Sequence, residues 1–99
     1  MTGAKDHVTV TVRAFATLRE VMDRELRCEY PSGVTVGTLL RDLVQKYNGL
    51  GALLFSDPET LRDYVNILVN GRNMEFLAGL STPLADGDTI ALFPPAAGG

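Results

Sequence analysis

Only one segment of this 99-residue chain, residues 35–50 (TVGTLLRDLVQKYNGL), has the pattern of a long amphipathic helix. Its apolar residues recur at intervals of three and four and form one stripe, made of Val36, Leu39, Leu40, Leu43, Val44 and Tyr47. Thr35 can accept a hydrogen bond from a first-turn amide as the N-cap, and Asn48–Gly49 supplies a left-handed stop. We interpret the stripe as part of the core and not as a groove for a partner.

Four other segments alternate in the manner of half-buried strands. They lie within residues 8–15 (VTVTVRAF), 25–30 (ELRCEY), 64–69 (YVNILV) and 89–93 (TIALF). The side chains expected to face the core are Val8, Val10, Val12, Leu26, Cys28, Tyr30, Val65, Ile67, Val69, Ile90 and Leu92. Pro31–Gly33 closes the second strand, and Asn70–Gly71 predicts a hairpin turn because both residues tolerate positive φ.

The connections between these elements have weaker patterns. Residues 16–24 predict a loop or a single helical turn. Residues 50–64 predict an irregular connection with a short helical piece, and 74–88 predict a short strand or turn that ends in a tight turn at 86–88.

The order of elements, a hairpin, then a helix, then further strands, predicts an α+β fold instead of alternating βαβ units. With one helix between them, the first and last strands can lie side by side. A chain of this length suits a single domain. We expect a flexible N-terminal arm over 1–7, a folded domain over 8–93 and a flexible tail over 94–99.

Composition excludes several classes of function. The net charge of −3 offers no basic stripe for nucleic acid, and an acidic surface instead suits a basic protein partner. One cysteine and one histidine cannot form a disulfide, a zinc site or an iron–sulfur site, so no metal is expected. No apolar run is long enough to span a membrane, and the first residues are not a signal peptide. We expect a soluble, cytoplasmic protein.

The chain ends in ALFPPAAGG, an unusual finish for a compact domain. Two prolines restrict φ and keep the chain extended, whereas two glycines are the costliest residues to order. Either the tail has no function, or the carboxylate of Gly99 is the functional group.

Three blocks carry a family resemblance: RAFATLRE near the start, ILVNG in the middle, and PLADGDTIALFPPAAGG at the end. Together they resemble the small subunit of molybdopterin synthase and the archaeal ubiquitin-like small modifier proteins, and more distantly the thiamine sulfur carrier. The resemblance implies the β-grasp (ubiquitin-like) fold, a mixed sheet packed on one main helix, in agreement with the pattern above.

The resemblance also implies a function for the tail. A partner related to the ubiquitin-activating enzymes uses ATP to adenylate the C-terminus at Gly99, and Gly98 lets the tail enter a narrow channel because glycine lacks a Cβ. The activated chain then becomes a thiocarboxylate that donates sulfur beside a large molybdopterin synthase subunit, or it is joined to a lysine of a target protein. In both mechanisms the chain is a carrier without a stably bound cofactor, not an enzyme. The alternative is a non-covalent β-grasp interaction module that does not use its tail.

Strand parity predicts a surface for the activating partner. Phe15, Leu68 and Phe93 alternate with core residues and therefore share the solvent face if their strands are neighbours. Pro94 and Pro95 then project the glycines away from the domain.

Self-modification has only two possible side-chain acceptors. Lys5 and Lys46 are the only lysines in the chain. Lys5 is the easier acceptor because it lies in the predicted arm, whereas Lys46 lies late on the predicted helix.

Other reactive residues have simpler interpretations. Cys28 could carry a persulfide or thioester, but its strand periodicity favours packing in the core. His7 precedes the first strand, where an isolated exposed histidine has no role, and no Ser-His-Asp set can be recognised. Asp86–Gly87–Asp88 is typical of a tight turn and falls far short of a calcium loop.

Overall fold

A computed structural model of the chain describes residues 6–57 and 60–95. The main sheet is built from β1 (His7–Ala14), β2 (Glu25–Pro31), β5 (Asn66–Val69), β6 (Arg72–Asn73) and β7 (Thr89–Phe93), in the order β2-β1-β7-β5-β6. The helices are α1 (Val36–Lys46) and α2 (Leu50–Leu54), with 3-10 turns η1 (Ala16–Glu20), η2 (Met74–Phe76) and η3 (Gly79–Ser81). A separate two-stranded sheet pairs β3 (Phe55–Asp57) with β4 (Thr60–Leu61).

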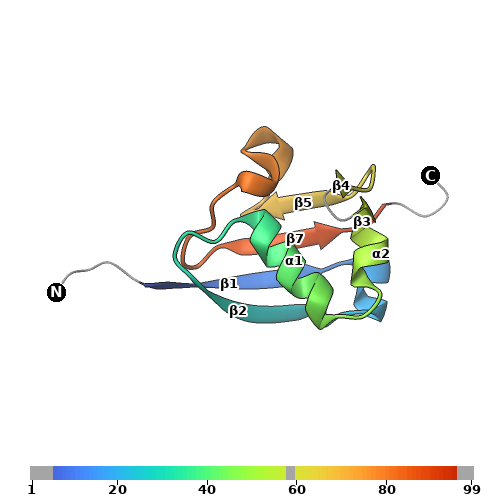
Figure 1. Cartoon of the computed structure of the whole chain (residues 1–99), viewed down its shortest axis with the longest axis horizontal. Coiled ribbons are helices and arrows are strands. Elements are labelled where there is room, and N and C mark those ends of the chain that lie inside the picture. Colours follow the sequence, from blue (N-terminus) through green and yellow to red (C-terminus); the bar gives the residue numbers. More distant parts are fainter. Residues whose placement is uncertain (1–5, 58–59, 96–99) are drawn as a thin grey trace.

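The first and last strands lie side by side, as predicted. β1 and β7 run parallel with Val12 opposite Ile90, while β2 and β5 flank this pair in antiparallel register. The sheet is therefore mixed, and α1 crosses one of its faces (Figure 1). This is the β-grasp architecture of ubiquitin-like proteins, and the predicted fold class is confirmed.

The core lies between the sheet and α1. The alternation of β1 is confirmed, because Val8, Val10 and Val12 are buried while Arg13 is exposed. The helix buries Val36, Leu39, Leu40 and Leu43 completely, and Val44 and Tyr47 pack partly against the core. Leu26 and Cys28 are only half-buried because β2 is an edge strand.

The ends of α1 differ slightly from the prediction. The Thr38 amide donates to Thr35 Oγ1 at 3.3 Å, so the N-cap is confirmed. The helix ends at Lys46, and Tyr47 is already extended. Gly49 adopts the left-handed conformation (φ 91°), but it caps the N-terminus of α2 instead of terminating α1.

The connection after α1 is more regular than its sequence indicated. The short helical piece is α2, and β3 and β4 then pair at the end of the sheet where β7 ends (Figure 1). Strands of two or three residues are too short to show a period, so no pattern could reveal this pairing. No helix in the described ranges is long and apolar enough to span a membrane.

Candidate functional site

An aromatic pair lies on the face of the sheet opposite α1. The rings of Phe15 and Phe93 stack with centroids 4.4 Å apart and an interplanar angle of 11°. Phe15 follows the last residue of β1, and its amide donates to the Leu92 carbonyl at 3.1 Å, which keeps it beside β7. Leu68 on β5 lies opposite Ala91, two positions before Phe93, on the same face. All three predicted side chains are half-buried. We call Phe15, Leu68, Ala91 and Phe93 the aromatic face.

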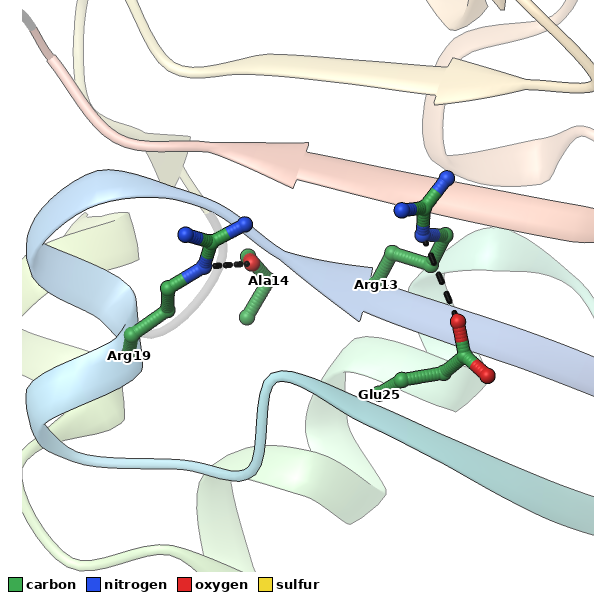
Figure 2. Close-up of polar contacts among 4 residues, drawn as sticks. All are labelled: Arg13, Ala14, Arg19 and Glu25. Atoms are coloured by element: carbon green, nitrogen blue, oxygen red, sulfur yellow. Dashed lines mark hydrogen bonds and ion pairs between the residues drawn. The ribbon is translucent and has the colours of Figure 1, made fainter.

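Two arginines border the aromatic face. The guanidinium carbons of Arg13 and Arg19 lie 5.5 Å and 5.3 Å from the centroid of the Phe15 ring, within cation–π range. Arg19 Nε donates to the Ala14 carbonyl at 2.9 Å, and Arg13 Nε lies 3.4 Å from Glu25 Oε1 (Figure 2). Neither arginine was predicted from the sequence as a residue of this surface, although Arg13 shares the parity of Phe15. The face is thus apolar at its centre and basic at one margin.

The aromatic face ends where the tail begins. Pro94 and Pro95 follow β7 directly and are half-buried. Pro95 lines a shallow groove together with Ser56 and residues 60–63, so the β3–β4 sheet lies beside the start of the tail. Gly98, Gly99 and Lys5 lie outside the described residues, and their proposed roles stay predictions.

The Asp86–Gly87–Asp88 turn is structural. Asp86 Oδ1 accepts the Thr9 amide at 2.8 Å, and Asp88 Oδ2 accepts the Ala85 amide at 2.7 Å. Gly87 has φ 90°, a conformation that favours glycine. No group of residues in the part of the chain that the structure describes could hold a metal ion. The turn therefore positions the start of β7 against β1.

Cys28 lies on the core side of β2, as predicted. Burial raises the pKa of its thiol, and its neighbour Tyr30 donates from its hydroxyl to Asp42 Oδ2 at 2.7 Å. A protonated, half-buried thiol is a poor nucleophile, which favours the packing interpretation. His7 is exposed at the start of β1.

Lys46 is exposed on the last turn of α1. Its ammonium nitrogen lies 5.5 Å from the centroid of the Tyr47 ring. The side chain is thus accessible on the side of the molecule that α1 covers, away from the aromatic face.

Two exposed aromatic residues were not predicted from the sequence as candidates for the site. Tyr64 is 81% exposed and adopts a left-handed conformation (φ 69°), and Phe76 is 82% exposed. The sequence predicted Tyr64 as the first residue of a strand, but β5 begins only at Asn66. Phe76 lies in η2, where no strand alternation applies.

Comparison with known proteins adds independent findings. Residues 12–99 match the model of the ThiS family. Small archaeal modifier protein 3 of Haloferax volcanii is 43% identical over 89 residues, which are 89% of this chain and 96% of that protein. The molybdopterin synthase sulfur carrier subunit of Mycobacterium tuberculosis is 37% identical over 97 residues, covering 93% of this chain and 99% of that protein.

A solved structure shares the fold at similar coverage. It is a chain of the crystal structure of the Amycolatopsis orientalis BexX/CysO complex, with a TM-score of 0.74 and 30% identity. The match covers 91% of this chain and 99% of that chain.

Proposed function

Because this chain belongs to the ThiS family, we propose that the C-terminal carboxylate of Gly99 is the group on which its function depends. The chain is a ubiquitin-like protein of the class that comprises sulfur carriers and protein modifiers. The observation that carries the proposal is the position of the Phe15–Phe93 stack, which lies directly before Pro94–Pro95. A partner that docks on this face meets the tail as it leaves the sheet.

A carboxylate is a poor electrophile, so the C-terminus at Gly99 must be activated before a nucleophile can attack it. A carboxylate oxygen of Gly99 attacks the α-phosphorus of ATP, pyrophosphate leaves, and an acyl adenylate forms in the active site of a partner enzyme. ATP is therefore the partner's substrate, and the reaction belongs in the cytoplasm. This chain contributes the tail and the docking face.

Pro94 and Pro95 restrict φ, and β7 is paired on both sides, with β1 and β5. The tail thus starts from a rigid point. Inside the partner, ordering of the remaining residues costs about 1–2 kcal/mol each in backbone entropy. Contacts on the aromatic face help to offset this cost.

Two fates of the adenylate are consistent with the relatives. Hydrosulfide (HS⁻) attacks the carbonyl, AMP leaves and the S–H proton is lost to water, giving a thiocarboxylate that donates sulfur beside a large molybdopterin synthase subunit. Alternatively, a lysine amine of a target protein attacks, AMP leaves, and an isopeptide bond forms. The 37% identity to a molybdopterin synthase sulfur carrier subunit favours the first fate, and the 43% identity to a small modifier protein favours the second.

The tail is tested with two variants, one lacking Gly99 and one with Gly98→Val. We expect neither to support ATP–pyrophosphate exchange by the purified activating enzyme, because the carboxylate falls short or the branched side chain blocks the channel. Thermal melts should match the parent protein. If the truncated protein is adenylated as fast as the parent, the tail proposal fails and a non-covalent interaction module is the better account.

Phe93→Ala tests whether the partner docks on the aromatic face. An aromatic anchor at an interface contributes about 1.4 kcal/mol or more, so we expect the KM for the carrier to rise about tenfold with an unchanged kcat. The fold should persist because Phe93 is only half-buried. Unchanged exchange kinetics in a folded variant would exclude this face as the docking site.

The fate of the adenylate is read from the protein recovered from its own cell. A sulfur atom at the C-terminus in the intact mass identifies the sulfur carrier. Foreign lysines that bear a glycine-linked branch identify the modifier.

A further inference from the structure

Tyr64 stands out on the surface because it is both exposed and strained. Its side chain is 81% exposed, and its φ of 69° lies in the left-handed region that non-glycine residues seldom occupy. A ring this exposed adds little to the core. Strained exposed residues are found where a surface serves binding, so the surroundings of Tyr64 are informative.

Tyr64 lines a groove of about 540 Å³ formed by residues 61–66 and 73–75. Asp63 and Glu75 bring two carboxylates to its walls, and within the described residues neither carboxylate has a hydrogen bond or ion pair. Arg62 also lines the groove, but its Nε donates to the Ala52 carbonyl at 2.7 Å. We call this feature the Tyr64 groove.

The Tyr64 groove adjoins the aromatic face. Asn66 lies opposite Phe93 in the β5–β7 register, and Asn73 lies opposite Leu68 in the β5–β6 register. The Asn73 side-chain amide donates to Asn66 Oδ1 at 3.1 Å, which joins the two strands at the border between the surfaces.

The Tyr64 groove also adjoins the start of the tail. Arg62 and Asp63 line both this groove and the shallow groove that contains Pro95. A partner that covers the aromatic face and receives the tail therefore reaches the Tyr64 groove as well.

We propose that the Tyr64 groove binds an arginine or lysine side chain from an exposed loop of the activating enzyme; this inference rests on the proposed function. An open tyrosine ring beside two carboxylates offers a cation both a π-face and ion pairs. The aromatic face has the opposite character at its margin, where Arg19 flanks Phe15 together with Arg13, whose charge is paired with Glu25. Opposite charges at the two ends of one docking surface fix the orientation of the partner.

The test uses two variants of the groove, Tyr64→Asn and the double variant Asp63→Lys/Glu75→Lys. Asparagine tolerates the left-handed conformation, so Tyr64→Asn removes the ring without new strain. Phe76→Asn is the matched control, because Phe76 is equally exposed (82%) and does not line the groove. KM for the carrier and kcat are measured by ATP–pyrophosphate exchange at low and high salt, with a thermal melt of each variant.

We expect Tyr64→Asn to raise KM about threefold or more, with kcat unchanged and a melting temperature that does not fall. The double variant should raise KM further at low salt and less at high salt, because screening weakens charge repulsion. Phe76→Asn should behave as the parent does.

Three outcomes would count against the inference. An unchanged KM in both groove variants, with Phe93→Ala still impaired, would overturn this inference and leave the proposed function intact. An equal effect of Phe76→Asn would overturn it too, since any exposed aromatic would then suffice. If the parent protein supports no exchange, the proposed function fails and the inference fails with it.

Discussion

At the scale of single residues, Tyr30 connects the edge strand β2 to α1. Its ring is buried, and its hydroxyl donates to Asp42 Oδ2 at 2.7 Å. Burial raises the pKa of Tyr30 far above its ordinary value, and the hydrogen bond to Asp42 raises it further. Burial also raises the pKa of the Cys28 thiol, although a hydrogen bond with Tyr30 and the charge of Lys46 act in the opposite direction.

These shifts predict a loss of stability at alkaline pH. Both groups are neutral when protonated, and their pKa values are higher in the folded chain. The unfolded chain therefore releases protons first, and the stabilisation present below the ordinary pKa values is lost as pH rises above them. The melting temperature should begin to fall near pH 9.0 for Cys28 and continue to fall above pH 10.0 for Tyr30.

The check is a series of thermal melts from neutral to strongly alkaline pH with Tyr30→Phe. Because this variant lacks the hydrogen bond to Asp42, its free energy of unfolding at neutral pH should be about 1–2 kcal/mol lower than the parent's. Its melting temperature should then fall less steeply than the parent's above pH 10.0, the ordinary pKa of the lost phenol. Part of the fall should remain, because burial and Asp23 also raise the pKa of Tyr47. Identical slopes would rule out Tyr30 as a source of the effect.

At the scale of elements, the β5–β6 turn is tied to the start of β7 by Asn70. Its side-chain amide donates to Asp88 Oδ1 at 2.8 Å, and its Oδ1 accepts the Thr89 amide at 2.9 Å. Asn70 has φ 51° and Gly71 has φ 85°, so both turn residues are left-handed, as the sequence predicted. The asparagine thus serves both the turn and the strand that leads to the tail.

Asn70→Gly and Asn70→Ala separate these two roles. Both lose the two side-chain hydrogen bonds, which should lower the free energy of unfolding by about 2 kcal/mol. Alanine is also destabilised by about 1–2 kcal/mol because it must adopt the left-handed conformation. Glycine instead gives the unfolded chain more conformational entropy, which lowers the free energy of unfolding by about 0.4–1 kcal/mol. We expect alanine to be the less stable variant by about 0.5–1 kcal/mol in urea unfolding. Equal stabilities would mean that the turn adapts to alanine without strain.

At the scale of the whole molecule, the sheet separates two surfaces. The helix α1 covers one face of the sheet (Figure 1) and carries the exposed Lys46 on its last turn. The side chains of the aromatic face alternate with the buried ones and therefore lie on the other face. A group attached to Lys46 therefore lies away from Phe15 and Phe93.

This separation predicts that a chain modified at Lys46 can still be activated. In Lys5→Arg, Lys46 is the only lysine left for self-linkage. The branched product should keep the parent's KM in pyrophosphate exchange, because its docking face stays open. A KM raised as far as that of Phe93→Ala would show that the two surfaces are not independent. Peptide mapping of self-linked parent protein should find the branch at Lys5 more often than at Lys46.

The repeating patterns of the chain were sufficient to predict its main elements. Alternation in β1 and β7 and the stripe on α1 identified the buried side chains, because side-chain direction in a strand or helix follows directly from its period. The same parity predicts that Phe15, Leu68 and Phe93 point away from the core. They share one face because β1, β7 and β5 are neighbours in the sheet. The Gly98–Gly99 tail is likewise a property of the sequence alone, because its proposed chemistry depends on residue type and not on packing.

Only the tertiary structure decided how distant residues meet. The Thr9 amide donates a hydrogen bond to Asp86 Oδ1, 77 residues away in the sequence. The Phe15 ring stacks on Phe93, with the Arg19 guanidinium over the Phe15 ring. The pairing of β3 with β4 and the place of Tyr64 beside Glu75 depend in the same way on contacts across the fold. Such contacts have no period along the chain, since they arise when the sheet closes on α1 and brings separate segments together. The sequence by itself thus determined the core and the candidate face, and the packed chain decided the charges and the groove around that face.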